Sequence, residues 1–262
     1  MKRWRYVLLV LCTAVISISG TYLMNYFMKS EENKQKYEDI SEIGFPETEA
    51  DHEEENDQQD VKQSEDDFDY QSLIAMNCDC VGWIQIPGTD INYPVVQAAD
   101  NEFYLTHNFN RETAACGAIF MDYRNDVDAK AEHLILYGHQ MKDNSMFKQL
   151  NGYKEEIFYK EHPNIKLYLH EQKYEYEITA VYVTDVANGG GYYNYLHWNT
   201  RKEQLNYLQQ KMAGYQIYDT GKKVMETDEL LSLSTCEYSS ENGRLIVQAR
   251  RKGEMTDGKQ II

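Results

Sequence analysis

The 262-residue chain has little positive charge for its size. It carries 26 Lys or Arg against 43 Asp or Glu, and no basic patch interleaved with aromatic residues is visible. Proteins that bind nucleic acids neutralise phosphates with such a patch, so we expect no nucleic-acid partner. The acidity is also local. Residues 31–70 hold 17 acidic and 3 basic side chains, which leaves the rest of the chain close to neutral despite a net charge of −17.

Cysteine is scarce, and its spacing excludes the common metal sites. There are five cysteines, and Cys78 and Cys80 with the distant Cys116 do not offer four zinc ligands at the usual spacing. The acidic tract lacks the alternating carboxylates and glycine of a calcium-binding loop. We therefore expect no metal or other cofactor, and unpaired thiols at these three positions. A disulfide from Cys116 to Cys78 or Cys80 is the alternative.

The amino terminus has the features of a membrane anchor. Lys2, Arg3 and Arg5 precede a charge-free stretch, residues 6–28, and its 23 residues suffice to cross a hydrocarbon core of about 30 Å as a helix. Positive charge before the span predicts a cytoplasmic amino terminus (residues 1–5) and a single-pass protein whose remainder is extracellular. The alternative is a cleaved signal peptide, but no Ala-x-Ala site follows the apolar run.

An acidic segment follows the apolar stretch. Residues 29–68 have high like charge and few apolar side chains, so they cannot bury enough surface to offset chain entropy. We predict a disordered spacer there and a catalytic domain over residues 69–262.

The pattern of the second half is mainly β. Short apolar runs separated by turn residues predict strands and a closed or nearly closed barrel, with candidates at residues 81–88, 91–96, 118–121, 134–137, 165–169, 174–183, 230–235 and 245–249. A short helix is expected within residues 68–78. A longer one is expected over residues 200–212, where Leu205, Leu208 and Met212 recur at helical spacing after a capping Thr200.

Three residues have the types and positions required for nucleophilic catalysis. Cys236 ends one strand-like run, and Arg244 lies eight residues later at the start of another. Only the thiolate attacks, and a guanidinium can stabilise it or the oxyanion formed on a carbonyl. His139 follows a hydrophobic run that breaks at Gly138, which suits an accessible proton-transfer group held by the scaffold.

The hairpin between Cys236 and Arg244 has two possible registers. The pair Asn242-Gly243 is a strong two-residue turn signal, yet a turn there would place Cys236 opposite Ala249. A wider loop over residues 238–242 instead places Cys236 directly across from Arg244, with Cβ atoms about 5 Å apart. Catalysis requires something close to this second register.

The segment Leu233-Ser234-Thr235-Cys236 with Arg244, together with Tyr137-Gly138-His139, resembles the active-site signature of sortases, most closely class B. The likeness spans roughly residues 70–252. Sortases are membrane-anchored cysteine transpeptidases of Gram-positive bacteria. The resemblance implies a sortase-type closed β-barrel of about eight strands, with one or more N-terminal helices and a long helix in the connection before the Cys236 strand. It also favours the wider hairpin loop.

The resemblance further implies partners and a reaction. A surface protein with a sorting signal of the Asn-Pro-x-Thr-x or Leu-Pro-x-Thr-Gly type would be cleaved through a Cys236 thioester. The protein would then be transferred to an amine of peptidoglycan or of its lipid-linked precursor. Alternatives are a pilin-joining sortase, another extracellular cysteine hydrolase such as a cell-wall amidase, and a membrane-tethered binding module that uses the aromatic residues 192–195.

Substrate-binding residues are less well specified by the sequence. The candidates for a substrate groove are Asn92, Ser234, Tyr195 and Leu196, and the backbone N–H of Glu237 is a candidate donor to the oxyanion.

Overall fold

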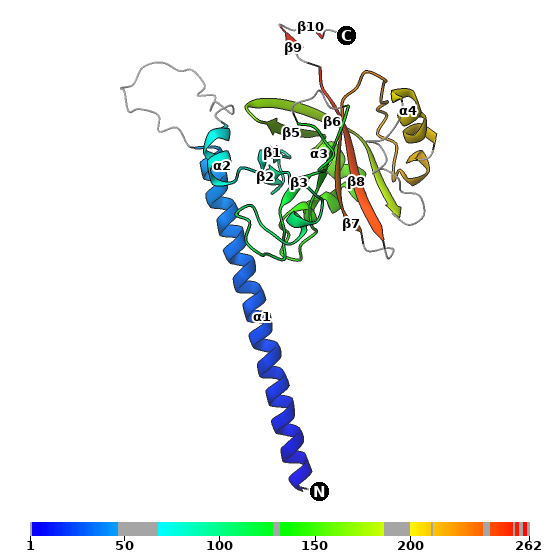
Figure 1. The fold of residues 1–262 in the computed structure, drawn as a ribbon. Coiled ribbons are helices and arrows are strands. Elements are labelled where there is room, and N and C mark those ends of the chain that lie inside the picture. Colours follow the sequence, from blue (N-terminus) through cyan, green and yellow to red (C-terminus); the bar gives the residue numbers. More distant parts are fainter. Residues whose placement is uncertain are drawn as a thin grey trace, which may run out of the picture. The chain divides into compact units, whose positions relative to one another are not determined.

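The computed structural model describes residues 2–46, 68–127, 132–185, 200–210, 212–237, 242–253, 255–256 and 259–260. The chain divides into two compact units, Met1–Asp39 and Ile40–Ile262. The first unit is helical, and the second contains a closed β-barrel (Figure 1).

Eight strands form the barrel, in the order β1-β2-β3-β4-β7-β8-β6-β5. They are β1 (Cys80–Gln85), β2 (Asn92–Val96), β3 (Ile119–Met121), β4 (His133–Tyr137), β5 (Asn164–Leu169), β6 (Gln172–Asp185), β7 (Leu230–Glu237) and β8 (Gly243–Arg251). The β2–β3 and β4–β7 pairs are parallel and the other pairs are antiparallel. Each strand overlaps one predicted from the sequence, so the expectation of a mainly β, closed barrel is confirmed.

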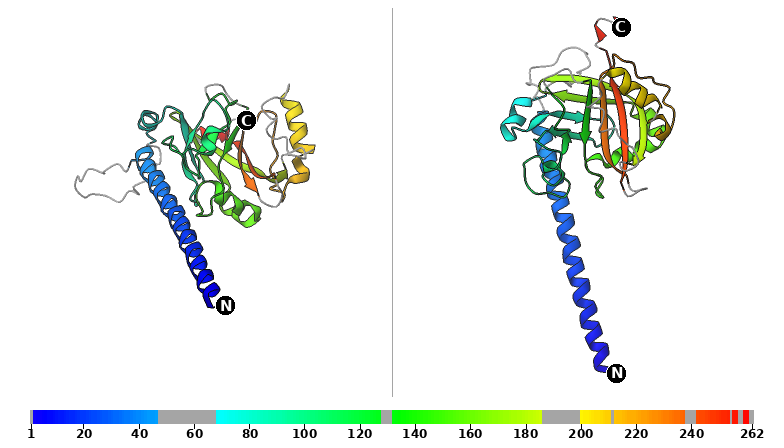
Figure 2. Two further views of the ribbon diagram at one scale, coloured as in Figure 1. Left: turned by 60° about the horizontal axis from the view of Figure 1, so that its bottom comes forward. Right: turned by 45° about the vertical axis from the view of Figure 1, so that its right-hand side comes forward.

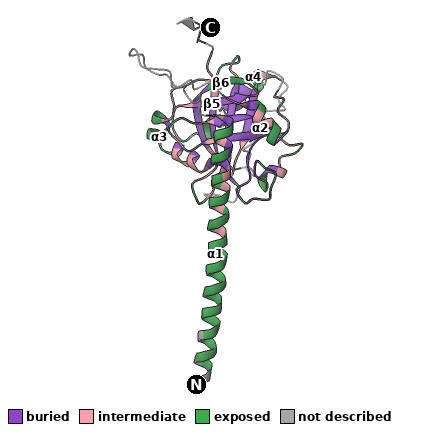
Figure 3. Ribbon diagram, turned by 90° about the vertical axis from the view of Figure 1, so that its left-hand side faces the viewer, coloured by how far each residue is buried: buried purple, intermediate pink, exposed green. Residues whose placement is uncertain are grey.

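Alternation along the strands separates an interior face from an outer face. Leu231, Leu233, Val247 and Ala249 are fully buried and lie on one face of the β7–β8 hairpin. In a closed barrel this face fills the interior, and Figure 3 shows the buried strands surrounded by more exposed segments. The opposite face carries Cys236 and points out of the barrel.

The helix α4 (Arg201–Gln210) covers part of that outer face (Figures 1 and 2). Leu205 and Leu208 are buried in one cluster, and the strand residues that they meet include Ile135, Tyr182 and Ile246. The predicted cap is confirmed, because the N–H of Glu203 donates to Thr200 Oγ1 at 3.3 Å. The predicted apolar stripe therefore packs on the barrel. The side chain of Met212 lies outside the described residues.

A second helix, α2 (Tyr70–Met76), precedes β1 and confirms the expected short helix. Its N-cap is Asp69, whose carboxylate accepts the N–H of Ser72 at 2.9 Å and its hydroxyl at 2.6 Å. These hydrogen bonds lower the pKa of Asp69. Nearby, the buried Trp83 packs edge-on against Phe45. Residues before the expected boundary at 69 therefore belong to the globular unit.

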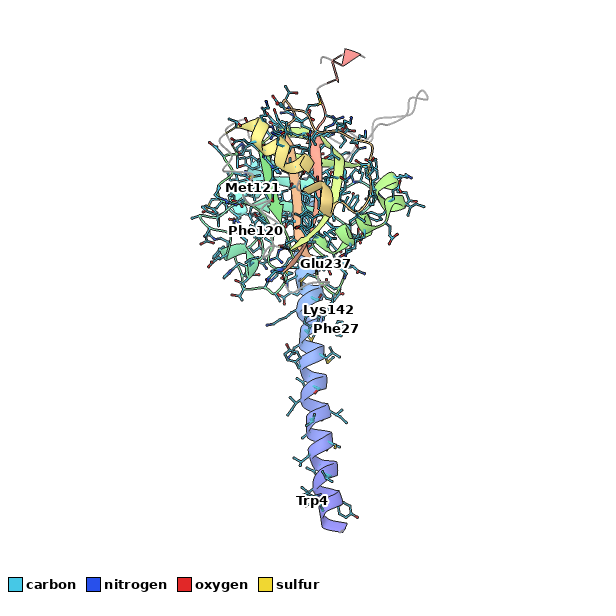
Figure 4. All side chains as sticks on the ribbon, turned by 90° about the vertical axis from the view of Figure 1, so that its right-hand side faces the viewer. Trp4, Phe27, Phe120, Met121, Lys142 and Glu237 are labelled. Carbon is cyan, nitrogen blue, oxygen red and sulfur yellow. The ribbon has the colours of Figure 1, made fainter. Side chains whose placement is uncertain are left out.

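The helix α1 (Lys2–Gly44) begins before the apolar stretch and continues beyond it. Among the described residues it is the one helix long and apolar enough to cross a membrane, and its apolar side chains, such as Trp4 and Phe27, are exposed (Figure 4).

Residues 29–44 are helical, whereas the sequence predicted a disordered spacer from residue 29. Two ion pairs at i,i+4 spacing explain the difference, Lys36–Glu32 and Lys34–Glu38, because such pairs stabilise a helix that is already nucleated by the preceding apolar run. The most acidic part of the predicted spacer, residues 47–67, lies outside the described residues.

Several short elements were not predicted. The 3-10 helix η1 (Phe103–Leu105) lies between β2 and β3. The 3-10 helix η2 (Phe147–Lys154) and the helix α3 (Glu156–Glu161) lie between β4 and β5. The 3-10 helix η4 (Met212–Tyr215) follows α4. Two short strands, β9 (Met255–Thr256) and β10 (Lys259–Gln260), pair with each other after β8. The segments η1 and η2 both contact the region around His139, as described next.

Candidate active site

Neighbouring strands present the three predicted catalytic residues in one row. The central strand is β7, with β4 on one side and β8 on the other. Cys236 lies opposite Arg244 of β8, and Arg244 lies opposite Thr184 of β6. On the other side, Tyr137 of β4 pairs with Ser234 of β7 in a parallel arrangement. His139 lies two residues after Tyr137, and Cys236 lies two residues after Ser234. The two residues therefore follow at the same level. The sheet therefore brings Cys236 between His139 and Arg244.

The β7–β8 register settles the choice between the two hairpin turns. Cys236 pairs with Arg244 and Glu237 pairs with Gly243, so the wider loop is correct. Directly opposed residues share one face of an antiparallel sheet, and the sulfur and the guanidinium therefore project from the same face. One guanidinium nitrogen, Nη1, donates to the carbonyl of Gly243 at 2.9 Å, which holds the guanidinium close to the backbone at the start of β8.

Three hydrogen bonds join the His139 segment to the Cys236 strand. The N–H of Gly138 donates to the carbonyl of Ser234 at 3.2 Å, and Thr235 Oγ1 donates back to the carbonyl of Gly138 at 2.8 Å. The Nε2 of Gln140 donates to the carbonyl of Cys236 at 3.1 Å. Because these bonds flank both residues, they fix the separation of the two segments on which the histidine and the cysteine lie.

The orientation of the His139 ring is set by η1. Its Nε2 lies 2.7 Å from the carbonyl oxygen of Leu105. A carbonyl oxygen only accepts, so Nε2 carries the hydrogen and Nδ1 is the nitrogen left for proton transfer.

Gly117 makes this close approach possible. Its φ is +59°, and a Cβ at this position would lie 2.5 Å from the carbonyl oxygen of Tyr104 and 3.1 Å from Cδ2 of His139. A side chain at residue 117 would therefore push against both η1 and the imidazole.

The loop after His139 closes back on the same residue. The N–H of Phe147 donates to the carbonyl of His139 at 2.9 Å, and Gln140 and Met146 form a bridge. The N–H of Met146 donates to the hydroxyl of Tyr93 at 3.0 Å. Burial raises the pKa of Tyr93 to about 12, so its hydroxyl stays neutral and serves as a fixed acceptor. The backbone on both sides of His139 is thereby held.

Thr184 extends the row beyond Arg244. It is 3% exposed, and among the described residues its Oγ1 has no hydrogen-bond partner. A buried hydroxyl without a partner is costly, and such groups are often completed by a ligand or water. No pattern in the sequence singles out Thr184 beyond its place in a strand.

Two predicted binding residues lie in β7 and differ in direction. Ser234 is on the same face as Cys236, two residues before it, and is 2% exposed. Glu237 follows Cys236 and its side chain is on the opposite face, where its Oε1 is 2.6 Å from Nζ of Lys154. Figure 4 labels Glu237 at the end of β7. The carboxylate is thus turned away from the face that presents the sulfur.

Asn92 is not brought to this row. It lies in β2, and β3 and β4 separate that strand from β7. Its Oδ1 accepts the indole N–H of Trp83 at 2.6 Å, and its Nδ2 donates to Ser41 Oγ at 3.0 Å. Both ends of the amide are used in packing the last turn of α1 on the barrel.

Tyr195 and Leu196 lie outside the described residues. Sequence reasoning missed several groups that support the site, namely Gln140, Thr235, Gly117 and the carbonyl of Leu105. Gln140 and Thr235 adjoin His139 and Cys236 in the chain, so their position was a usable signal. Gly117 and Leu105 meet His139 only through the fold.

None of the five cysteines, all of which the structure describes, forms a disulfide. Cys80 and Cys116 are buried, and burial raises the pKa of the Cys80 thiol to about 12. Since only a thiolate is strongly nucleophilic, Cys80 is unsuited to catalysis. Cys236 is partly exposed at the end of its strand.

Comparison with known proteins identifies the family. The sortase domain model matches residues 84–252, which contain β2–β8, the end of β1 and the whole row described above. This match covers more than half of the chain.

Characterised relatives give the same result. The chain is 38% identical to sortase B of Listeria monocytogenes over 180 residues, covering 68% of this chain and 72% of that protein. It is 30% identical to sortase B of Staphylococcus aureus over 261 residues, covering 95% and 97%. The crystal structure of Bacillus anthracis sortase B in complex with AAEK2 is similar with a TM-score of 0.70 and 34% identity, covering 84% of this chain and 96% of that one.

Proposed function

Because this chain belongs to the sortase family and is a cysteine transpeptidase most similar to class B, we propose that it anchors surface proteins to the cell wall. In this proposal it cleaves a C-terminal sorting signal and joins the new carboxyl end to an amine of peptidoglycan or its lipid-linked precursor. The observation that carries the proposal is the row formed by Cys236 on β7, Arg244 on β8 and His139, which follows the end of β4.

The first half-reaction forms a thioester. The Cys236 thiolate attacks the carbonyl carbon of the scissile peptide, and the carbonyl oxygen becomes an oxyanion. The guanidinium of Arg244, held opposite the sulfur, stabilises this negative charge, with the backbone N–H of Glu237 as a second donor. The C–N bond then breaks, and the departing amine takes a proton from His139.

The hydrogen bond to Leu105 supports Nδ1 as the nitrogen of His139 that transfers the proton. Since Nε2–H donates to the carbonyl oxygen, the proton delivered to the amine comes from Nδ1 of the imidazolium. In the second half-reaction the amine acceptor attacks the thioester and Nδ1 takes up its proton, so the cysteine is regenerated. Attack by water instead would give hydrolysis.

The outer face that carries Cys236 is proposed to bind the sorting signal. Ser234, two residues before Cys236, and Thr184, across from Arg244 on β6, lie on this face. The described residues supply no hydrogen-bond partner for the Thr184 hydroxyl, which suits a hydrogen bond to the bound peptide. Tyr195 and Leu196, in the connection before α4, are proposed to complete the groove. The signal is of the Asn-Pro-x-Thr-x or Leu-Pro-x-Thr-Gly type.

The amino-terminal part of α1 is proposed to anchor the enzyme in the cell membrane, with residues 1–5 in the cytoplasm and the barrel outside. Support comes from the exposed apolar side chains of residues 6–28 and the basic residues before them. Cell fractionation tests this assignment. Full-length protein is expected in the membrane fraction, and processed protein free in the medium would contradict it.

The reaction is tested with a panel of sorting-signal peptides, each with and without an amine acceptor. Wild type is compared with Cys236→Ala, His139→Ala and Arg244→Ala, and Cys78→Ala serves as a control because Cys78 is another free, exposed thiol. We expect the three active-site variants to lose at least about 100-fold in kcat/KM. Added acceptor should redirect the wild-type product from acid to amide. Equal turnover in wild type and the three variants would exclude the proposal.

A further inference from the structure

An ion pair with a buried carboxylate lies next to the proposed nucleophile in the chain. Glu237, the residue after Cys236, is 7% exposed, and its Oε1 is 2.6 Å from Nζ of Lys154. Lys154 is the last residue of η2 and its side chain is 35% exposed. A buried carboxylate requires a partner, because burial removes the water that would stabilise its charge.

The segment η2 joins both reacting residues. At its start, the N–H of Phe147 donates to the carbonyl of His139. At its end, Lys154 binds the carboxylate next to Cys236. Between them, Nζ of Lys148 donates to Oε1 of Gln140 at 3.3 Å, and Gln140 in turn donates to the carbonyl of Cys236. The eight residues of η2 thus connect the two segments from the side of the barrel away from the sulfur.

Charge gives Lys154 a role beyond anchoring. A carboxylate adjacent to Cys236 disfavours negative charge on the sulfur unless a cation offsets it. The charged and titratable groups that face the end of β7 are Arg244 from β8, His139 from the loop after β4, and Lys148 and Lys154 from η2. Lys154 contacts the Glu237 carboxylate directly, with Nζ 2.6 Å from Oε1.

We propose that Lys154 is a positioning residue for acyl transfer, which fixes the end of β7 through Glu237 and offsets the carboxylate charge beside Cys236. The inference rests on the proposed function of Cys236 as nucleophile. Lys154 itself contacts no substrate in this role, because the ion pair lies on the face opposite the sulfur.

The test uses the full-length protein in detergent and two measurements. The first is peptide turnover, with kcat and KM separated. The second is the rate at which iodoacetamide alkylates Cys236 at neutral pH, followed by mass spectrometry so that Cys78 is counted separately. Lys154→Met removes the cation, Lys154→Arg preserves it, and the double variant Lys154→Met/Glu237→Gln removes both charges. Lys160→Met is the matched control, because Lys160 forms an exposed ion pair with Glu156 on α3.

We expect Lys154→Met to lower both kcat and the alkylation rate about tenfold with little change in KM, because the uncompensated carboxylate disfavours the thiolate. Lys154→Arg and the double variant should recover most of both rates, and Lys160→Met should match wild type. If Lys154→Met does not fold, Lys154→Gln replaces it, since the amide keeps a donor to the carboxylate but lacks the charge.

A lower melting temperature with unchanged kcat and alkylation rate would reduce Lys154 to a structural role and overturn the inference. Failure of the double variant to recover would overturn it as well. Failure of the proposed function is separable. Wild type that turns over no peptide, while Lys154→Met still slows alkylation, would reject the transpeptidase assignment and retain the effect of Lys154 on Cys236.

Discussion

The side-chain amide of Gln140 illustrates how single residues hold this site together. It follows His139 in the chain and donates to the carbonyl of Cys236, so one residue bridges the two segments that carry the proposed base and nucleophile. A neutral hydrogen bond of this kind contributes about 1 kcal/mol net, which is enough to alter the geometry of a nearby proton transfer.

Replacing Gln140 with leucine keeps the volume and removes the donor. We expect kcat to fall about five- to tenfold, because about 1 kcal/mol of positioning is lost, and the melting temperature to fall only slightly. Steady-state kinetics with a sorting-signal peptide measures the change. Gln71→Leu is the control, since Gln71 forms an exposed hydrogen bond to Glu171. Equal kcat in both variants would show that the bridge has no part in catalysis.

His133 makes the barrel sensitive to acid. It is fully enclosed under α4, its Nε2 lies 2.9 Å from Ser232 Oγ, and the Nε2 of Gln204 lies 3.3 Å from its Nδ1. Burial, with a smaller effect from the charge of Arg201, lowers the pKa of His133 from 6.5 to about 3. The neutral ring is therefore favoured in the folded state, and the unfolded chain takes up the proton first.

The resulting stability is present above pH 6.5 and is lost as the pH falls toward 3. Between pH 7 and pH 5 we expect this one group to lower the free energy of unfolding by about 2 kcal/mol. Urea denaturation of wild type and His133→Gln at both pH values isolates the effect, because glutamine does not titrate. Identical pH dependence in the two proteins would contradict the assignment of His133 as buried and neutral.

At the scale of elements, η1 and the turn before β3 together orient His139, the proposed proton-transfer residue. Leu105 supplies the carbonyl and Gly117 supplies the space, and neither adjoins His139 in sequence. These short elements have too few residues for a hydrophobic period to appear, so the sequence did not predict η1 or η2. The eight barrel strands were predicted, because their alternation and apolar runs are local and repeated.

Gly117→Ala tests this arrangement. Both the positive φ and the contact with His139 oppose a Cβ, so we expect a loss of about 1–3 kcal/mol in stability and at least about tenfold in kcat. Gly221→Ala is a matched control, since Gly221 has φ +70° and no atom within 4 Å of the Cβ position. It carries the same backbone strain without the steric contact. Similar kcat values in the two variants would show that Gly117 does not position His139.

At the scale of the whole molecule, the boundary of the globular unit differs from the sequence prediction. We expected the catalytic domain to begin at residue 69, but the compact unit begins at Ile40, which is 3% exposed, and Phe45 packs on Trp83. The prediction was drawn from the acidic composition of residues 29–68, and composition does not reveal that a few apolar residues within a polar segment are buried.

Two truncations test this boundary. A protein of residues 40–262 should stay soluble without detergent and retain peptide turnover, because the exposed apolar part of α1 is removed and the compact unit is complete. A protein of residues 69–262 should be less stable by about 2–5 kcal/mol, since Trp83 loses the cover of Gly44 and Phe45. Thermal and urea denaturation compare the two. Equal stability would place the boundary at residue 69.

The sequence alone determined the β-barrel, the capped helix before the Cys236 strand, and the cysteine, histidine and arginine on which the proposed chemistry depends. These features follow from local periods and from residue chemistry, which short segments carry by themselves. The tertiary structure confirmed the wider turn that places Cys236 opposite Arg244, which family resemblance favoured and turn propensity did not. Only the tertiary structure decided that Asn92 packs against Trp83 and Ser41. Strand register depends on contacts between distant segments, and a shift by one residue moves every side chain to the opposite face.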